Sequence, residues 1–258
     1  MQYFDKFIRK EPINSSFWRL YDLDDYKSLL RFIKTITGRY VLDFACGDGR
    51  NTSTISKVSG SVIGVDVSHQ SIRIAASHNE KGNINFIVCD GSKLPFQEAV
   101  FSAAIVVDAL HHFKSISTPL KEISRVLNKE NAGLYVKDLL YSPIVSISES
   151  LIRFAPKFIK QKIPEFSECD MIPHTNGVMK YDLLSFISSM NFVIIRNESS
   201  SFLLPYLVRG LFIGPFRFLE KSDKLASILY KADKQLGQTF IGRFPRSITI
   251  SSNRNKAH

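Results

Sequence analysis

The stretch VLDFACGDGR, residues 41–50, decides the fold of this chain of 258 residues. An apolar run over Tyr40–Ala45 leads into a turn with small residues at positions 45, 47 and 49, and a helical pattern over Asn51–Val58 follows. Small residues let the backbone turn tightly and approach a ligand, and the first N–H groups of a helix are free to bind one. The stretch therefore predicts a buried strand, a ligand-binding turn and a helix, in that order.

The spacing of the turn indicates which kind of ligand it suits. A dinucleotide-binding fingerprint, G-x-G-x-x-G, would place its third glycine where this chain has Arg50. The carboxylates of Asp43 and Asp48 would also repel a pyrophosphate, whereas a sulfonium that carries an amino acid has positive groups and tolerates them. The turn therefore favours a partly cationic ligand over a dinucleotide.

Four more apolar runs are typical of buried strands, and helical patterns separate several of them. Strands that alternate with helices of this length form a parallel sheet with helices on both faces. The sequence therefore predicts the α/β class, with a doubly wound, mostly parallel sheet. The runs are Ser61–Val67, Ile84–Cys89, Phe101–Val107 and Gly133–Lys137, and the further helical patterns are Ser68–His78 and Thr118–Leu127.

Acidic residues stand at the ends of four of the predicted strands. They are Asp66, Asp90, Asp108 and Asp138. Ligands of doubly wound sheets bind outside the carboxyl ends of the strands. This row of acids therefore indicates a binding site.

We divide the chain into three parts. Residues 1–37 are expected to form an N-terminal helical cap, and residues 38–138 the α/β core. Residues 139–258 are expected to add a substrate-side insert, the final strands and lid helices to the same domain. The elements expected are a helix within Phe17–Ile36, helical stretches around Ile144–Ile159 and within Leu207–Leu236, a helix at Tyr181–Met190, strands at Phe192–Ile195 and Ser247–Ile250, and a disordered tail, Asn253–His258.

The composition is typical of a soluble intracellular domain. The three cysteines form no C-x-x-C pair and no zinc-ligand pattern, so no metal site is expected. No apolar run reaches the roughly 18–20 residues of a membrane span, and we expect a cytoplasmic protein. Residues 131–258, with 17 Lys and Arg against 10 Asp and Glu, carry +7 of the net charge of +10. This basic half could attract nucleic acid, anionic lipid or an acidic substrate, or simply be solvated.

Two stretches of the second half, residues 151–164 and 207–221, mix large apolar residues with basic ones. Such stretches can lie on a membrane surface or line an apolar pocket. They can equally be core and lid helices whose basic side chains reach solvent. Peripheral contact with a membrane is therefore left open.

From about residue 38 to residue 138, the chain resembles the class I S-adenosylmethionine-dependent methyltransferases of small molecules. VLDFACGDG (41–49) resembles the first motif of that family, with Ala45 in the place of its first glycine, a change that costs little if the φ of Ala45 is negative. The resemblance implies a Rossmann-like methyltransferase fold, S-adenosylmethionine as cofactor, and methyl transfer to a small molecule. It extends, in order, through FIVCDGSKLPF (86–96), DALHHF (108–113) and LKEISRVLNKENAGLYV (120–136).

The resemblance also implies a set of cofactor-binding residues. A carboxylate at Asp66 can accept hydrogen bonds from both ribose hydroxyls, as acids do about 20 residues after such a turn. Asp90 stands where family members hold the adenine amine, and Gly91 leaves room for the ring. The predicted cofactor-binding residues are Asp43, Ala45, Gly47, Gly49, Asp66, Val67, Asp90, Gly91 and Asp108.

His111 and His112 follow the fourth strand, where the resemblance places the reactive methyl group, and either could accept a proton from the acceptor. The alternative is that they only pack beside the cofactor or cap a helix. The expected acceptor is a small molecule, because the chain lacks the N-P-P-Y type of turn expected for base amino groups. It could be lipid-like, a polyketide, a quinone or a sugar. An RNA methyltransferase recruited through the basic half and a non-catalytic cofactor-binding module remain alternatives.

Overall fold

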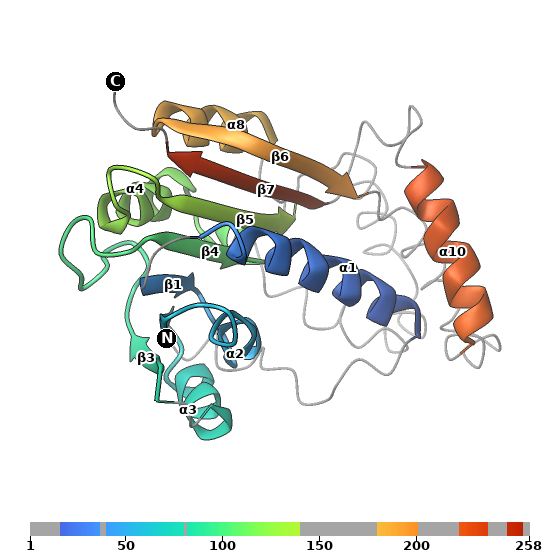
Figure 1. Ribbon diagram of the computed structural model, residues 1–258, viewed down its shortest axis with the longest axis horizontal. Helices are drawn as coiled ribbons and strands as arrows, with labels where there is room; N and C mark the ends of the chain where they lie inside the picture. The colour runs from blue at the N-terminus through green and yellow to red at the C-terminus, as the bar shows by residue number, and fades with distance from the viewer. Residues whose placement is uncertain are drawn as a thin grey trace, which may run out of the picture.

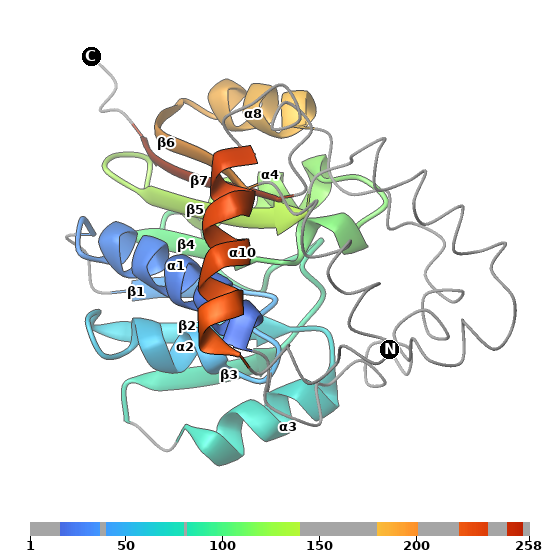
Figure 2. The same ribbon diagram turned by 90° about the vertical axis from the view of Figure 1, so that its right-hand side faces the viewer.

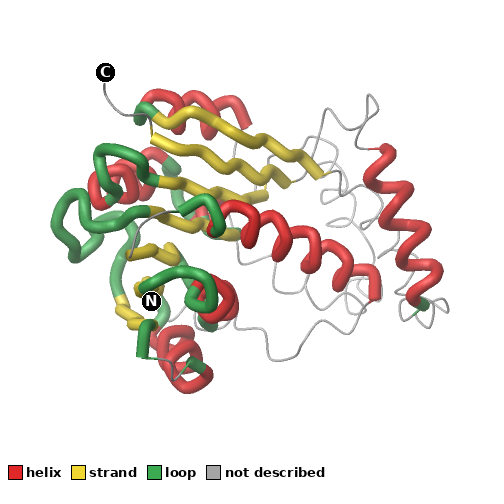
Figure 3. Tube along the Cα trace, viewed as in Figure 1, coloured by secondary structure: helices red, strands yellow, loops and turns green. Residues whose placement is uncertain are grey.

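The computed structural model describes residues 16–36, 40–79, 82–139, 180–200, 222–236 and 247–254. Their strands form one layer with helices on both sides (Figure 1, Figure 3). The helices are α1 (Ser16–Ile33), α2 (Arg50–Ile55), α3 (His69–His78), the short 3₁₀ helix η2 (Leu110–His112), α4 (Ser117–Val126), α8 (Lys180–Ser189) and α10 (Asp223–Leu236). The strands are β1 (Tyr40–Phe44), β2 (Ser61–Asp66), β3 (Ile84–Val88), β4 (Ala103–Val107), β5 (Gly133–Leu139), β6 (Phe192–Ser200) and β7 (Ser247–Arg254).

The seven strands form a single sheet in the order β3-β2-β1-β4-β5-β7-β6. Strands β1 to β5 pair in parallel, and β7 pairs antiparallel with both β5 and β6. The direction of winding reverses between β1 and β4, and sheets of this kind bind ligands at that point, outside the carboxyl ends of the strands. The doubly wound, mostly parallel α/β fold expected from the sequence is confirmed.

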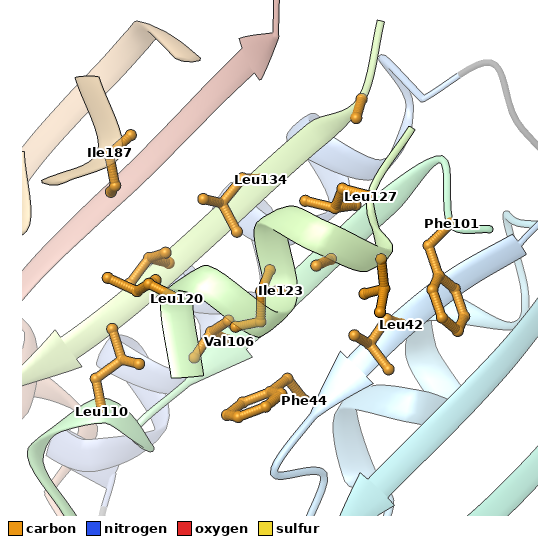
Figure 4. Packing of buried hydrophobic residues seen from close by; sticks show 14 of the residues in the cluster. Leu42, Phe44, Phe101, Val106, Leu110, Leu120, Ile123, Leu127, Leu134 and Ile187 are labelled. Atoms are coloured by element: carbon orange, nitrogen blue, oxygen red, sulfur yellow. The ribbon is translucent and has the colours of Figure 1, made fainter. Parts of the chain in front are cut away.

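Apolar side chains cover both faces of the sheet. On one face, Leu120 and Ile123 of α4 pack with Leu42 of β1, and α8 extends the same cluster (Figure 4). On the other face, Phe32 of α1 packs in a second cluster with Val41 of β1. Successive residues of β1 thus enter opposite clusters. Two-sided burial explains why the parallel strands are continuous apolar runs in the sequence.

The last two strands are longer than the sequence predicted. Strand β6 continues to Ser200 and β7 to Arg254, so the prediction of a disordered tail is wrong for Asn253 and Arg254. These polar residues are ordered because β7 lies between β5 and β6, and its backbone pairs with both neighbours. The helical stretch Ile144–Ile159, the two basic and apolar stretches, and residues 255–258 lie outside the described residues.

Helices from the two ends of the chain meet beyond the carboxyl ends of the parallel strands. The first turns of α1 reach α10, which stands in front of the sheet in Figure 2. Asp24 of α1 accepts a hydrogen bond from the Tyr230 hydroxyl, and its Oδ2 lies 2.9 Å from Lys234 Nζ of α10. Among the described helices, none is long and apolar enough to cross a membrane.

Candidate active site

The turn after β1 is built from three left-handed residues. Ala45, Gly47 and Gly49 have φ values of 55°, 55° and 78°. A negative φ, the condition under which alanine would cost little at this position, is therefore not met. An alanine in this conformation costs on the order of 1 kcal/mol, and the backbone bond from Cys46 N–H to the Val65 carbonyl of β2, at 2.9 Å, helps to hold it there.

The two glycines of the turn serve different purposes. A Cβ at Gly49 would lie 2.9 Å from the Ala75 Cβ of α3 and 3.0 Å from the ring of Phe86, so Gly49 allows helix and strand to pack closely. A Cβ at Gly47 would meet no atom of the described residues within 4 Å. With respect to the part of the chain that the structure describes, the space beside Gly47 is therefore open, and a ligand can approach the backbone of the turn at this point.

Asp66, at the end of β2, is joined to this turn. Its Oδ2 accepts a hydrogen bond from Gly47 N–H and its Oδ1 accepts one from Ser68 N–H, each at 2.9 Å. Helix α3 is capped by Ser68, whose Oγ accepts from Ser71 N–H at 3.1 Å. Each Asp66 oxygen keeps a further lone pair, so the carboxylate can both hold the turn and accept bonds from a ligand. Val67, which follows, is half-buried.

Asp43 lies beneath the turn and not at its surface. It is 1% exposed, and Oδ2 accepts a hydrogen bond from Thr52 Oγ1 of α2 at 2.5 Å. Burial raises the pKa of Asp43 to about 7; the bond from Thr52 opposes the rise, and the nearby Asp66 and Asp48 add to it. Any part that Asp43 plays in binding is therefore exerted through the position of α2 and the turn.

Asp90 is exposed at the end of β3, and its Oδ1 accepts a hydrogen bond from Ser92 N–H at 2.8 Å. A Cβ at the next residue, Gly91, would lie 2.3 Å from Phe44 Cζ and 3.1 Å from Phe113 Cζ. Gly91 is thus needed for the loop to pack on these two rings. The sequence alone suggested only that it leaves room for a ligand.

Asp108, at the end of β4, is also left-handed, with φ 50°. Its backbone N–H donates to the Lys137 carbonyl at 2.8 Å, and its Oδ2 lies 3.6 Å from Lys137 Nζ. The predicted cofactor-binding carboxylate is therefore paired with a lysine of the neighbouring strand β5.

The turn after β4 is organised by Asp138 of β5, which is fully buried. Its Oδ2 accepts hydrogen bonds from the N–H groups of Ala109, at 3.1 Å, and Leu110, at 2.5 Å. Its Oδ1 lies 2.6 Å from Nδ1 of His111, whose side chain is 8% exposed. The sequence placed Asp138 in the row of acids at strand ends but gave it no role among the predicted cofactor-binding or catalytic residues. That strand-end position was the one signal available, because the contact joins residues 27 positions apart.

His112 packs beside His111, with ring centroids 4.0 Å apart and an interplanar angle of 45°. Burial of part of its ring lowers the pKa of His112 to about 4, and the nearby His111 adds to this effect, although the residue as a whole is exposed. His112 is therefore neutral at neutral pH. Of the two histidines, His111 is the one that contacts a buried carboxylate.

The arrangement gathers the predicted residues at the carboxyl ends of adjacent strands. The turn 45–49 follows β1, Asp66 ends β2, and Asp90 follows β3. Across the switch point, His111 follows β4 and contacts Asp138 of β5. Such an edge can hold a small cationic cofactor on the β1–β3 side and present a histidine to a second molecule on the β4–β5 side.

The chain is similar in sequence to known methyltransferases. The family model of a methyltransferase domain matches residues 41–130. An O-methyltransferase of Aspergillus nomiae is 28% identical over 150 residues, which cover 56% of this chain and 66% of that protein. A demethylmenaquinone methyltransferase of Lactococcus lactis is 34% identical over 116 residues, 43% of this chain and 46% of that protein. The chain thus spans only part of the length of these curated relatives.

A solved structure shares the fold. The crystal structure of a putative methyltransferase from Bacillus halodurans superposes with a TM-score of 0.58 at 16% identity, covering 90% of this chain and 100% of that one. Residues 41–130 of this chain thus form an S-adenosylmethionine-dependent methyltransferase domain.

Proposed function

We propose that this protein transfers a methyl group from S-adenosylmethionine to a hydroxyl oxygen of a small-molecule acceptor, with His111 as the general base. The observation that carries the proposal is the contact between His111 Nδ1 and the buried carboxylate of Asp138, at 2.6 Å. This pair lies at the carboxyl edge of the sheet, across the switch point from the turn that the family uses for its cofactor.

The residues after β1, β2 and β3 would hold the cofactor. The open space beside Gly47 admits a ligand to the turn, and the spare lone pairs of Asp66 suit two ribose hydroxyls. The exposed carboxylate of Asp90 suits the adenine amine. When bound, S-adenosylmethionine supplies an electrophilic methyl group on a sulfonium. Val67 and Gly91 complete this proposed set together with Asp108, which follows β4, and Asp43 supports it from below.

The His111–Asp138 pair would prepare the acceptor. An ionised carboxylate only accepts hydrogen bonds, so it holds the proton of a neutral imidazole on Nδ1 and leaves a lone pair on Nε2. The acceptor oxygen would form the new bond to the methyl carbon as the bond from that carbon to the sulfonium sulfur breaks, and the cofactor would leave as a neutral thioether. Nε2 would take the hydroxyl proton. Proton removal by a positioned base contributes about 10²–10⁴-fold to the rate of such a step. His112, neutral and beside His111, would help to position the ring.

Hydroxylated aromatic or quinone-like molecules are the acceptor class that we propose. Support comes from the relatives, one of which is named an O-methyltransferase and another a demethylmenaquinone methyltransferase. An acceptor of this kind dissolves in lipid, and peripheral membrane contact, which the sequence left open, would suit it.

Two measurements test the proposal. Calorimetry should detect binding of S-adenosylmethionine, and its absence at millimolar cofactor would refute the proposed function. Incubation of the protein with labelled cofactor and a cell extract should then yield a labelled methyl ether, identified by mass spectrometry. His111→Asn should abolish this product without loss of cofactor binding. A label found on carbon or nitrogen would contradict oxygen as the acceptor atom.

A further inference from the structure

Helix α4 carries an ion pair, Glu122–Arg125, that forms hydrogen bonds with the backbone of the segment after Asp90. The guanidinium of Arg125 donates from Nε to Glu122 Oε1 at 2.9 Å and from Nη2 to Glu122 Oε2 at 2.8 Å. It also donates from Nη1 to the Phe96 carbonyl at 2.8 Å and from Nη2 to the Leu94 carbonyl at 3.0 Å. The Leu94 N–H in turn donates to Glu122 Oε2 at 2.8 Å. Both polar groups of the Leu94 backbone are therefore held by this pair, which we call the loop clamp.

The clamp is a partly buried network of several hydrogen bonds. The side chains of Arg125 and Glu122 are only 30% and 19% exposed. Arg125 uses the planar fork of its guanidinium on three partners at once, a pattern that the single ammonium of lysine does not reproduce. The hydrogen bonds from Arg125 lower the pKa of Glu122, as expected for a carboxylate held in its ionised form.

A short chain of backbone contacts links the clamp to the proposed cofactor site. The Lys93 N–H donates to the Asp90 carbonyl at 3.0 Å, which closes a turn, and Asp90 Oδ1 accepts from Ser92 N–H within it. Leu94 follows this turn directly, and its side chain is buried. The position of Asp90 thus depends on where Leu94 is anchored, and Leu94 is anchored to α4.

We propose that Glu122 and Arg125 are positioning residues that hold the Asp90 turn in the geometry that binds the cofactor. Neither side chain touches the cofactor in this scheme; both act through the backbone of Leu94. The helix that carries them begins five residues after His112, so the clamp also ties the adenine side of the site to the segment that holds the histidines. The inference rests on the proposed function, because it assigns Asp90 to the cofactor.

The expected effect is a loss of affinity with little loss of turnover. If the turn adopts the binding geometry only a tenth of the time once the clamp is broken, the apparent Kd for S-adenosylmethionine rises about tenfold. Once the cofactor is bound, the turn is held by its ligand, so kcat at saturating cofactor should stay within about twofold of the wild-type value.

The experiment compares Arg125→Met and Arg125→Lys with a matched control, Asn83→Ala. Asn83 Nδ2 donates to the carbonyls of Ser56, at 3.0 Å, and Gly60, at 2.9 Å, and so also fastens a loop through two side-chain-to-backbone bonds. That loop lies at the amino ends of β2 and β3, away from the proposed site. Calorimetry gives the Kd for S-adenosylmethionine, chemical denaturation gives the stability, and amide hydrogen exchange reports on residues 90–99.

Both Arg125 variants should bind S-adenosylmethionine about tenfold more weakly and exchange faster over residues 90–99, while Asn83→Ala loses stability at unchanged affinity. A wild-type Kd in folded Arg125→Met would overturn the inference. So would equal weakening in Asn83→Ala, which would make the effect one of general stability. If Arg125→Met does not fold, Arg125→Lys is used in its place: a weaker Kd supports the inference, and a wild-type Kd overturns it. Absence of cofactor binding by the wild type would instead refute the proposed function, and the exchange rates would still show whether the clamp holds the turn.

Discussion

The turns after β1 and β4 are built on the same plan and differ in one respect. Each contains a left-handed residue other than glycine, Ala45 in the first and Asp108 in the second. Each is held by a carboxylate at the end of the next strand, where backbone N–H groups donate to Asp66 in the first turn and to Asp138 in the second. The same arrangement, a carboxylate at a strand end that accepts backbone hydrogen bonds, thus holds the turn on each side of the switch point.

The two turns differ in the further hydrogen bonds that the carboxylate can make. Asp66 is only partly buried, bonds to backbone alone, and keeps lone pairs for a ligand. Asp138 is fully buried and contacts a histidine. We infer that the first turn is built to bind and the second to perform chemistry. Substitutions in the two turns should therefore affect different quantities.

The largest effect is expected from Asp138→Asn. The amide would no longer hold His111 in the useful tautomer, and kcat should fall about 10²–10⁴-fold. The Kd for S-adenosylmethionine should stay near that of the wild type. His112→Asn is the matched control, because His112 is already neutral at neutral pH, and it should leave the pH dependence of kcat between 5 and 8 unmoved. Steady-state kinetics of the wild type, Asp138→Asn and His112→Asn measure these effects. If Asp138→Asn kept more than a third of the wild-type kcat, the role of Asp138 in holding His111 would be contradicted.

A second prediction concerns the carboxyl of Asp43, buried beneath the first turn. Its folded-state pKa of about 7 lies above the ordinary value of 3.8, so the folded protein binds more protons than the unfolded chain between these values. The free energy of unfolding should therefore fall, by on the order of 3 kcal/mol, as the pH rises from about 4 to 7. Asn at this position can still accept the bond from Thr52 and does not ionise. Denaturation curves of Asp43→Asn should lose this part of the pH dependence, and an unchanged pH slope would contradict the prediction.

Asp66→Ala should act on binding alone. Loss of the ribose acceptor and of the bond that holds Gly47 should raise the KM for S-adenosylmethionine about 10–100-fold, since each hydrogen bond to a charged group contributes roughly 1.5–3 kcal/mol. The value of kcat at saturating cofactor should change little. An unchanged KM would show that Asp66 does not bind the cofactor. A large fall in kcat would contradict the inference that the first turn acts in binding and only the second in the chemical step.

The smallest effect is expected from Ala45→Gly. Glycine relieves the left-handed strain at position 45, although it adds freedom to the unfolded chain, so a net gain of about 0.5–1 kcal/mol in stability is expected. Asp108→Gly should gain less, because aspartate tolerates this conformation better and pairs with Lys137. Urea denaturation of both variants checks the difference, and a loss of stability in Ala45→Gly would contradict it.

Much of the fold was predictable because its signals are local. Two-sided burial makes β1, β2 and β4 apolar runs, and each ends at a turn that a small or acidic residue marks. The longer strand β7 was not predictable, because polar residues such as Asn253 are ordered only by pairing with strands distant in sequence.

The site was predictable in part for the same reason. Gly47 and Asp66 stand out by type and spacing, but the link between His111 and Asp138 is a tertiary contact that no local pattern encodes. The left-handed φ of Ala45 was also missed, since a side chain normally argues against that conformation and its neighbours impose it here.

Calorimetric titration of S-adenosylmethionine into Asp66→Ala and Asp138→Asn, side by side with the wild type, tests the division between the two turns most directly, because it requires no knowledge of the acceptor. The wild type and Asp138→Asn should bind with the same affinity, and Asp66→Ala at least about tenfold more weakly. Equal weakening in both variants would contradict the account.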